Sequence, residues 1–302
     1  MSSSIRHDAN HRPGPASSSR GEVAGMLSIV VPARNEAENF PQLLDEIARW
    51  FRPLTGPRSE GPRLAGYEVI VVDDGSTDET VAVLNGLAAE HPELRPIRMA
   101  RNVGQSAATA AGFREARGEW VAVLDADLQN RPEDLAKLWD ALPGYDAALG
   151  WRIKREDVWS KRVVSRWANR VRNRVLGQSI RDTGCSVRIF RREAAIRLPS
   201  FRGGHRFLGP LLIREGSRVV QVPVTHRPRV HGTSNYSFRN RSFAVVIDLL
   251  GVAWLMRRPV RYDLIEWPGA SASAHAPHLA MTRSKERDGE FAPSGPQQQE
   301  AA

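Results

Sequence analysis

Residues 123–134 read VLDADLQNRPED, an apolar run that leads straight into two aspartates one residue apart. The run belongs to the longer stretch EWVAVLDADLQ, which has the composition of a buried strand. Asp125 and Asp127 repel each other and are costly to bury unless a cation neutralises them. Mg²⁺ and Mn²⁺ prefer oxygen ligands and complete their shells with substrate phosphates and water. The stretch therefore predicts a strand ending in a metal and diphosphate site, whereas an acidic turn with Asp127 capping the next helix is the alternative.

The chain before this strand repeats the order of strand, polar turn and helix. MLSIVVPARNEAENFPQLLDEIARWF (26–51) and YEVIVVDDGSTDETVAVLNGLAAE (67–90) both follow it, and a short strand over 96–99 precedes a Gly/Ala-rich helix over 104–116. This alternation predicts an α/β, Rossmann-like fold with a mixed, mostly parallel sheet flanked by helices. Ligands bind such sheets beyond the carboxyl ends of the strands. We therefore expect the three strand-end turns to converge on one crevice, and Ser76 or Thr77 to cap the helix that follows them.

Length and cysteine content bound the class of protein. The chain has 302 residues with 41% apolar content, enough to bury the core of one large domain or two small ones. The single cysteine, Cys185, excludes an intramolecular disulfide and a Cys-rich metal site, which favours a reducing, cytoplasmic compartment. Residues 1–25 and 259–302 are expected to be disordered tails, which leaves a folded domain over 26–241 and a helix over 242–258.

The charge is unevenly distributed along the chain. The formal net charge is +9, but residues 1–150 carry 15 Lys/Arg against 22 Asp/Glu, while residues 151–241 carry 22 against 5. Such a basic block typically binds phosphate groups, which can belong to nucleic acid, an anionic lipid or a phosphorylated substrate. The alternative is that it is only a well-solvated surface. Nucleic-acid binding is disfavoured because the acidic crevice would repel the ligand and no reading element is present.

Four motifs occur together in the order and spacing of a known family. They are VVPARNEAEN, VIVVDDGSTDET, RNVGQSAATAAGFREARGEWVAVLDADLQNRPED and DTGCSVRIFRREA. The chain resembles the family 2 glycosyltransferases with the GT-A fold. The later RVHGTSNY resembles an element of the polyprenyl-phosphate sugar transferases, the group of dolichol-phosphate mannose synthase. The resemblance covers roughly residues 26–258 and implies a metal-dependent, inverting transferase that uses a nucleoside-diphosphate sugar.

The resemblance implies a role for each residue that matches a family motif. Bordering the nucleotide would be Pro32, Asn35, Glu36, Asp73 and Asp74, with Asp74 making the direct contact near the base. A Mg²⁺ or Mn²⁺ ion would be held by Asp125, Asp127 and Gln129, although Gln129 by itself could equally be a solvent-exposed turn residue.

The basic block would hold the leaving diphosphate and an incoming lipid phosphate. By resemblance, the phosphate-facing residues are Arg152, Arg162, Ser165, Arg229 and Ser234, and the catalytic set is Asp127 with the three arginines. His231 is expected to be a loop residue. The chain departs from the family at Asn235, where Lys is common, and Arg239 or Arg241 could make that contact instead.

The scarcity of Asp and Glu in the second half of the domain indicates the kind of acceptor. An inverting transferase that acts on a sugar hydroxyl needs a general base, whereas a phosphate nucleophile is already ionised. FRGGHRFLGPLLIREG (201–216) offers no acid before Glu215, which favours a polyprenyl phosphate acceptor. The alternative is transfer to a saccharide hydroxyl of a cell-envelope glycan with Asp182 as base, although DTG is expected to shape the acceptor loop. A catalytically degenerate, membrane-surface binding protein is disfavoured because the metal-site residues are present.

Two segments have the composition of helices that lie on a membrane surface. SFAVVIDLLGVAWLM (242–256) is interrupted by Asp248 and falls short of the roughly 20 apolar residues of a membrane span. Trp254 and the arginines that follow suit an interfacial helix, and residues 158–176 mix aromatic, aliphatic and basic side chains in the same way. Ordinary packing against the core is the alternative for both. We expect a protein bound peripherally to an anionic membrane at its cytoplasmic, inner face, and the sequence leaves GDP-mannose and UDP-hexose donors undecided.

Overall fold

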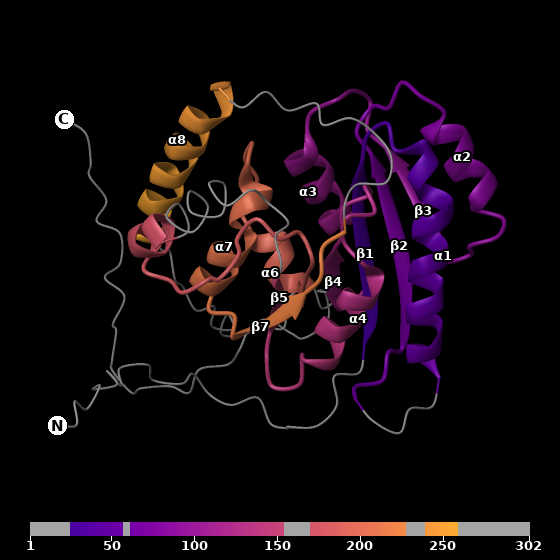
Figure 1. The fold of residues 1–302 in the computed structure, drawn as a ribbon, viewed down its shortest axis with the longest axis horizontal. Helices are drawn as coiled ribbons and strands as arrows, with labels where there is room; N and C mark the ends of the chain where they lie inside the picture. The colour runs from indigo at the N-terminus through magenta and orange to yellow at the C-terminus, as the bar shows by residue number, and fades with distance from the viewer. Residues whose placement is uncertain (1–24, 57–60, 154–169, 228–238, 259–302) are drawn as a thin grey trace, which may run out of the picture. The chain divides into compact units, whose positions relative to one another are not determined.

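A seven-stranded sheet in the order β3-β2-β1-β4-β6-β5-β7 organises the part of the chain that the computed structural model describes (Figure 1). The described residues are 25–56, 61–153, 170–227 and 239–258. Strand β1 pairs in parallel with β2 and β4, β2 with β3, and β5 with β7. Strand β6 runs antiparallel to both of its neighbours. The expected mixed, mostly parallel sheet is confirmed.

The first half of the sheet is built from repeated strand and helix units. Each polar turn predicted from the sequence lies between a strand and the helix that follows it. The elements are β1 (Met26–Ala33), η1 (Ala37–Asn39), α1 (Phe40–Phe51), η2 (Arg52–Thr55), β2 (Gly66–Asp73), α2 (Thr80–Leu87), β3 (Leu94–Arg98), α3 (Gln105–Glu115), β4 (Trp120–Val123) and α4 (Pro132–Asp140).

The second half adds the antiparallel strand and further helices. Residues 170–176 are helical, which agrees with the predicted end of the segment 158–176. The other elements are β5 (Ala147–Arg152), β6 (Arg188–Arg191), α6 (Arg192–Arg197), η3 (Gly204–Phe207), α7 (Leu208–Arg214), β7 (Val219–Val224) and α8 (Arg239–Met256).

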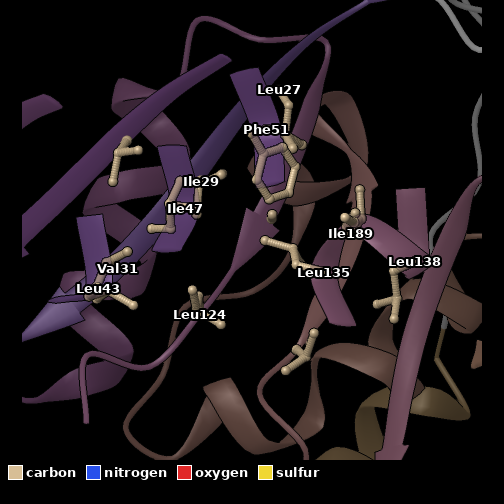
Figure 2. Packing of buried hydrophobic residues seen from close by; sticks show 14 of the residues in the cluster. Leu27, Ile29, Val31, Leu43, Ile47, Phe51, Leu124, Leu135, Leu138 and Ile189 are labelled. Carbon is tan, nitrogen blue, oxygen red and sulfur yellow. The ribbon is translucent and has the colours of Figure 1, made fainter. Parts of the chain in front are cut away.

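Strand side chains alternate between two apolar cores, one on each face of the sheet. Leu27, Ile29 and Val31 of β1 pack with residues of α1 and α4, and Figure 2 shows them with Ile47 and other members of this cluster. Val30 faces the opposite cluster, which contains residues of α3, α6, α7 and α8. Because both faces are covered, β1, β2 and β4 are mostly apolar, and the buried polar pair inside them, Ser28 and Glu68, is joined by a hydrogen bond of 2.6 Å. The polar turns that follow β1, β2 and β4 lie together at the carboxyl ends of these parallel strands.

Candidate active site

The loops that follow β1 and β2 are joined by hydrogen bonds. The Asn35 N–H donates to Ser76 Oγ at 2.9 Å, and the Thr77 N–H donates to Asn35 Oδ1 at 2.9 Å. Asn35 has a φ of 56°, a left-handed conformation that asparagine tolerates better than most residues. Two of the predicted strand-end turns therefore form one structure.

The same contacts correct one expectation about α2. Ser76 and Thr77 contact Asn35, and neither side chain caps the helix. The helix begins at Thr80, whose N–H donates to Asp78 Oδ1 at 3.1 Å. The cap position is Glu79, so Ser76 and Thr77 lie two or more residues too early to cap the helix, and they join the loop to Asn35 instead.

Asp74 ties the β2 turn to the loop before α3. Its carboxylate accepts hydrogen bonds from the Val103 N–H at 2.7 Å, the Gly104 N–H at 2.8 Å and Asn102 Nδ2 at 3.0 Å. The neighbouring Asp73 accepts the Ser76 N–H through Oδ1 at 2.9 Å. Asp74 is therefore a loop organiser in this structure, and its direct contact with a nucleotide stays a prediction.

Helix α3 carries the network on to the paired aspartates. Gln105, at its first position, donates to Asp125 Oδ1 at 2.9 Å. The chain of contacts from Asn35 through Asp74 and Gln105 to Asp125 brings all three predicted turns together. Gln105 carries no signal of this contact in the sequence, because GQSAATAAG indicates only a small-residue helix.

Burial and mutual repulsion destabilise the charged form of Asp125. Burial raises the pKa of this carboxyl group above its ordinary value, and the nearby Asp127 raises it further, while a hydrogen bond with Ser186 offsets only part of the effect. Asp127 is also buried, and its Oδ1 accepts the Gln129 N–H at 3.2 Å. Next to it Leu128 has a φ of 59°, which is uncommon for a residue with a branched side chain. The loop from Asp125 to Gln129 is therefore held in a conformation that costs free energy.

The donor set at this loop fits a hard divalent cation. In the described part of the chain, no three His, Cys, Asp or Glu side chains gather as a metal site. Mg²⁺ is characteristically held by one or two carboxylates together with substrate phosphates and water, so a third acidic ligand is not required. Asp125 and Asp127, with the amide oxygen of Gln129, provide that kind of set, and a cation would offset the repulsion that raises the pKa of Asp125.

Arg152, at the end of β5, is held in place by Asp182. Its Nε and Nη2 donate to the two carboxylate oxygens at 2.7 and 3.1 Å, and Asp182 Oδ1 also accepts the Gly184 N–H at 3.0 Å. This geometry agrees with the expectation that DTG shapes a loop. It does not favour Asp182 as a general base, because both of its oxygens already bind donors.

Arg188 is absent from the residues predicted from the sequence and lies within the sheet on β6. Its side chain is buried, with Nη1 donating to the His205 carbonyl at 2.7 Å and Nη2 to the Thr183 carbonyl at 2.8 Å. Burial lowers the pKa of this guanidinium, and Asp125 is among the groups that raise it. A charged residue inside the apolar stretch SVRIF is the signal that could have identified it.

Several predicted site residues lie outside the residues that the structure describes. They are Arg162, Ser165, Arg229, His231, Ser234 and Asn235. The backbones of Arg239 and Arg241 belong to α8. Pro32 and Glu36 are described, and the Glu36 N–H donates to Thr80 Oγ1 at 3.1 Å beside the joined loops.

Helix α8 has one face on the core and one exposed apolar stripe. Val252 and Ala253 pack in the second core cluster, whereas Val246, Leu250 and Trp254 are more than half exposed. Residues spaced by four lie on one side of a helix, so these three form a continuous stripe. Among the helices of the described residues, none is both long enough and apolar enough to cross a membrane.

Comparisons with known proteins agree on one family. The family model for glycosyl transferase family 2 matches residues 28–198. Dodecaprenyl-phosphate galacturonate synthase from Rhizobium johnstonii is 35% identical over 241 residues, which are 78% of this chain and 68% of that protein. Undecaprenyl-phosphate 4-deoxy-4-formamido-L-arabinose transferase from Serratia proteamaculans is 36% identical over 222 residues, which are 72% of this chain and 65% of that protein. The chain thus spans about two thirds of the length of these relatives.

The sheet and its helices also match solved structures. A mannosyltransferase from Pyrobaculum calidifontis, solved with GDP-mannose and Mn²⁺, superposes with a TM-score of 0.55 at 23% identity. The match covers 81% of this chain and 68% of that one. At this identity the likeness establishes the shared fold.

Proposed function

The chain belongs to glycosyl transferase family 2, and from this premise we propose that it transfers a sugar from a nucleoside-diphosphate sugar to a polyprenyl phosphate. The observation that carries the proposal is the network joining the ends of β1, β2 and β4 at Asp125 and Asp127. The two relatives described above are named for acceptors of this kind. The reaction is a single displacement that inverts the configuration of the anomeric carbon.

Charge neutralisation is the main task of the donor side. Asp125, Asp127 and Gln129 would hold a Mg²⁺ or Mn²⁺ ion, which when bound would neutralise the diphosphate as the leaving group departs. Gln105 orients the Asp125 carboxylate. The loops around Pro32, Asn35, Glu36, Asp73 and Asp74 would border the nucleotide.

The acceptor phosphate is its own nucleophile. One of its oxygens forms the new bond to the anomeric carbon while the bond to the nucleoside diphosphate breaks, so no proton needs to be removed. Arg152, Arg162 and Arg229, with Ser165 and Ser234, would hold the two phosphate groups close together. No protein nucleophile is needed, and burial raises the pKa of Cys185 to about 11, which keeps this thiol protonated near neutral pH.

The identity of the sugar is left open by the chemistry that these enzymes share. The two relatives are named for galacturonate and formamido-arabinose, and the solved mannosyltransferase contains GDP-mannose. Both GDP- and UDP-linked sugars are therefore candidates, including mannose, other hexoses, hexuronic acids and amino-pentoses.

Peripheral binding to an anionic membrane would bring the enzyme to its lipid acceptor. The exposed stripe of α8 supports this, because Leu250 and Trp254 lie close in sequence to Arg257 and Arg258 at the end of the helix. The Arg258 guanidinium lies 5.2 Å from the centre of the Trp254 ring, so apolar and cationic groups share one surface.

The test is transfer by the purified protein. A panel of GDP- and UDP-sugars is incubated with polyprenyl phosphate and Mn²⁺ or Mg²⁺, and the configuration of the product is assigned by NMR. We expect a glycosyl-phosphate lipid whose anomeric configuration is opposite to that of the donor. Retention of configuration, or preferential transfer to a free sugar hydroxyl, would contradict the proposal and favour the saccharide-acceptor alternative.

A further inference from the structure

The segment that leaves β7 is fastened to α4 by a buried carboxylate. Asp134, in the first turn of α4, is 1% exposed. Its Oδ2 accepts the Thr225 N–H at 2.9 Å and the Thr225 hydroxyl at 2.7 Å. The first residue after β7 is thereby fixed beside the helix that follows the metal loop, residues 125–129.

Arg227 makes two further attachments from the same segment. Its N–H donates to the carbonyl oxygen of Gln129 at 2.9 Å. Its guanidinium donates through Nη1 and Nη2 to the two carboxylate oxygens of Glu46 on α1, at 3.0 and 2.5 Å. The Arg227 backbone therefore contacts the metal loop while its side chain is anchored on a different helix.

The ion pair is favourable in its setting. Burial alone would raise the pKa of Glu46, but hydrogen bonds from Arg227 and Gln42 hold it below its ordinary value. The side chains of Arg227 and Glu46 are only 28% and 17% exposed, so water screens the pair less than it would screen a fully exposed one. Bidentate pairs of arginine and carboxylate also fix orientation, which a single contact does not.

We propose that Arg227 is a positioning residue. Its ion pair with Glu46 fixes the position of the Gln129 carbonyl, and with it the metal loop, relative to the segment that follows β7. The inference rests on the proposed function, because that segment leads within two residues to Arg229, the expected acceptor-phosphate ligand. The loop needs outside support, since Leu128 adopts a left-handed conformation directly after the paired aspartates. This clamp, the Arg227–Glu46 pair, thus links α1 to the metal loop through the backbone of Arg227.

A second bidentate pair of arginine and carboxylate, beside the same strand and more exposed, provides the control. Arg218, just before β7, donates from Nε and Nη2 to Asp146 at 3.0 and 3.3 Å. This pair has the same chemistry, but it lies at the opposite end of the strand from the metal loop. The variants are Glu46→Gln, Arg227→Gln, their double mutant, Asp146→Asn and Arg218→Gln.

Hydrogen exchange of the full chain tests the clamp without reference to activity. We expect Glu46→Gln and Arg227→Gln to accelerate exchange in peptides covering 125–131, and Asp146→Asn and Arg218→Gln to leave those peptides unchanged. The double mutant should match the single ones, because both residues act through one pair. If the Glu46 and Arg227 variants change exchange only in α1, the pair is a local brace and the proposal is wrong.

Metal titration and kinetics then separate positioning from general stability. Mn²⁺ binding should weaken about tenfold in both clamp variants, as is typical when a partner of a metal-ligating residue is lost. At saturating Mn²⁺, kcat should fall while the donor KM approaches the wild-type value. A clamp variant with unaltered exchange, Mn²⁺ affinity and kcat would overturn the inference. Failure of the wild-type protein to transfer any sugar would overturn the proposed function instead, and the exchange experiment would still decide the clamp.

Discussion

Asp125 and Asp127 are poorly placed for stability and well placed for binding a cation. Both are at least half-buried at the end of an apolar strand, and burial together with their mutual repulsion raises the pKa of Asp125. Gln105, which donates to Asp125 at 2.9 Å, is neutral and cannot cancel the negative charge. Sites that bind ligands commonly keep such costs, because the ligand removes them.

Replacing both aspartates by alanine should abolish transfer and preserve the fold. We expect Asp125→Ala/Asp127→Ala to lose at least about 10²–10³-fold in turnover, the effect of removing a major electrostatic contribution. The melting temperature of the metal-free protein should stay equal or rise, because the repulsion is gone. Turnover, circular dichroism and thermal unfolding check this. Full activity of the wild-type protein in excess EDTA would show that the metal assignment is wrong.

Helix α3 links packing to the site at the level of a whole element. Its first residue, Gln105, contacts Asp125, and its body lies close to β1 at Gly112. A Cβ atom on Gly112 would overlap Val30 Cγ1, far inside normal contact distance. The glycine therefore sets how closely the helix approaches the sheet, and hence where Gln105 lies.

Gly112→Ala should destabilise the protein where Gly86→Ala does not. Overpacking against Val30 is expected to cost about 1–3 kcal/mol. At Gly86 on α2, a Cβ atom would have no neighbour within 4 Å, so alanine there should gain up to about 1 kcal/mol from helix propensity. Urea unfolding measures both. Adding Val30→Ala should recover part of the loss at Gly112, and equal effects at the two glycines would contradict this account of α3.

The exposed stripe of α8 should decide binding to anionic vesicles. Leu250→Ser/Trp254→Ser should reduce co-sedimentation with phosphatidylserine vesicles while leaving thermal unfolding nearly unchanged, since both side chains are 60% exposed. Arg257→Gln/Arg258→Gln should remove about 1 kcal/mol per charge at low salt. Trp50→Ser on α1, another exposed tryptophan, is the control and should bind like the wild type.

High salt should release much of the vesicle-bound protein, because screening weakens its attraction to anionic lipid. Retention after alkaline carbonate extraction would contradict peripheral binding. Either result concerns the mode of attachment and leaves the transfer assay as the test of activity.

At the scale of the whole molecule, several partly buried carboxylates make stability depend on pH. Burial alone would raise the pKa of Glu46, Glu93 and Asp146, but hydrogen bonds and nearby arginines hold each pKa below its ordinary value of 4.5, 4.5 and 3.8 respectively. At these three groups the unfolded chain therefore binds more protons than the folded chain in acid, whereas Asp125, whose pKa is raised by burial, contributes with the opposite sign. The stabilisation is complete above the unfolded-state pKa values and is lost as the pH falls through the folded-state values.

The free energy of unfolding should accordingly fall as the pH is lowered from about 5 to 3. Denaturant titrations at several pH values measure the slope. Glu46→Gln/Asp146→Asn should flatten it, because these groups no longer titrate, and an unchanged slope would assign the effect to other carboxylates. The contribution of Asp146 is expected to be small, since its partner Arg218 is largely exposed and screened by water.

The order of elements in the first half of the sheet, and the convergence of its strand-end turns, could be predicted from the sequence alone. Apolar strands alternating with helices specify a parallel, doubly covered sheet, and parallel strands direct their carboxyl ends to one edge. Asn35, Asp74 and Asp125 each follow a strand in the sequence, so their convergence needed only this topological rule. The family motifs identified the same residues independently.

The partner of each polar group was decided only by the tertiary structure. Asp74 binds the loop over 102–104, Arg152 binds Asp182, and Arg227 binds Glu46 across 181 residues of sequence. No local periodicity encodes such pairs, because they depend on strand register and on how closely helices approach the sheet. The sequence thus determined which strand-end turns meet at one edge of the sheet. Packing decided which residues hold one another there, Gln105 and Arg188 among them, because hydrogen bonds form only at donor–acceptor distances of about 3 Å.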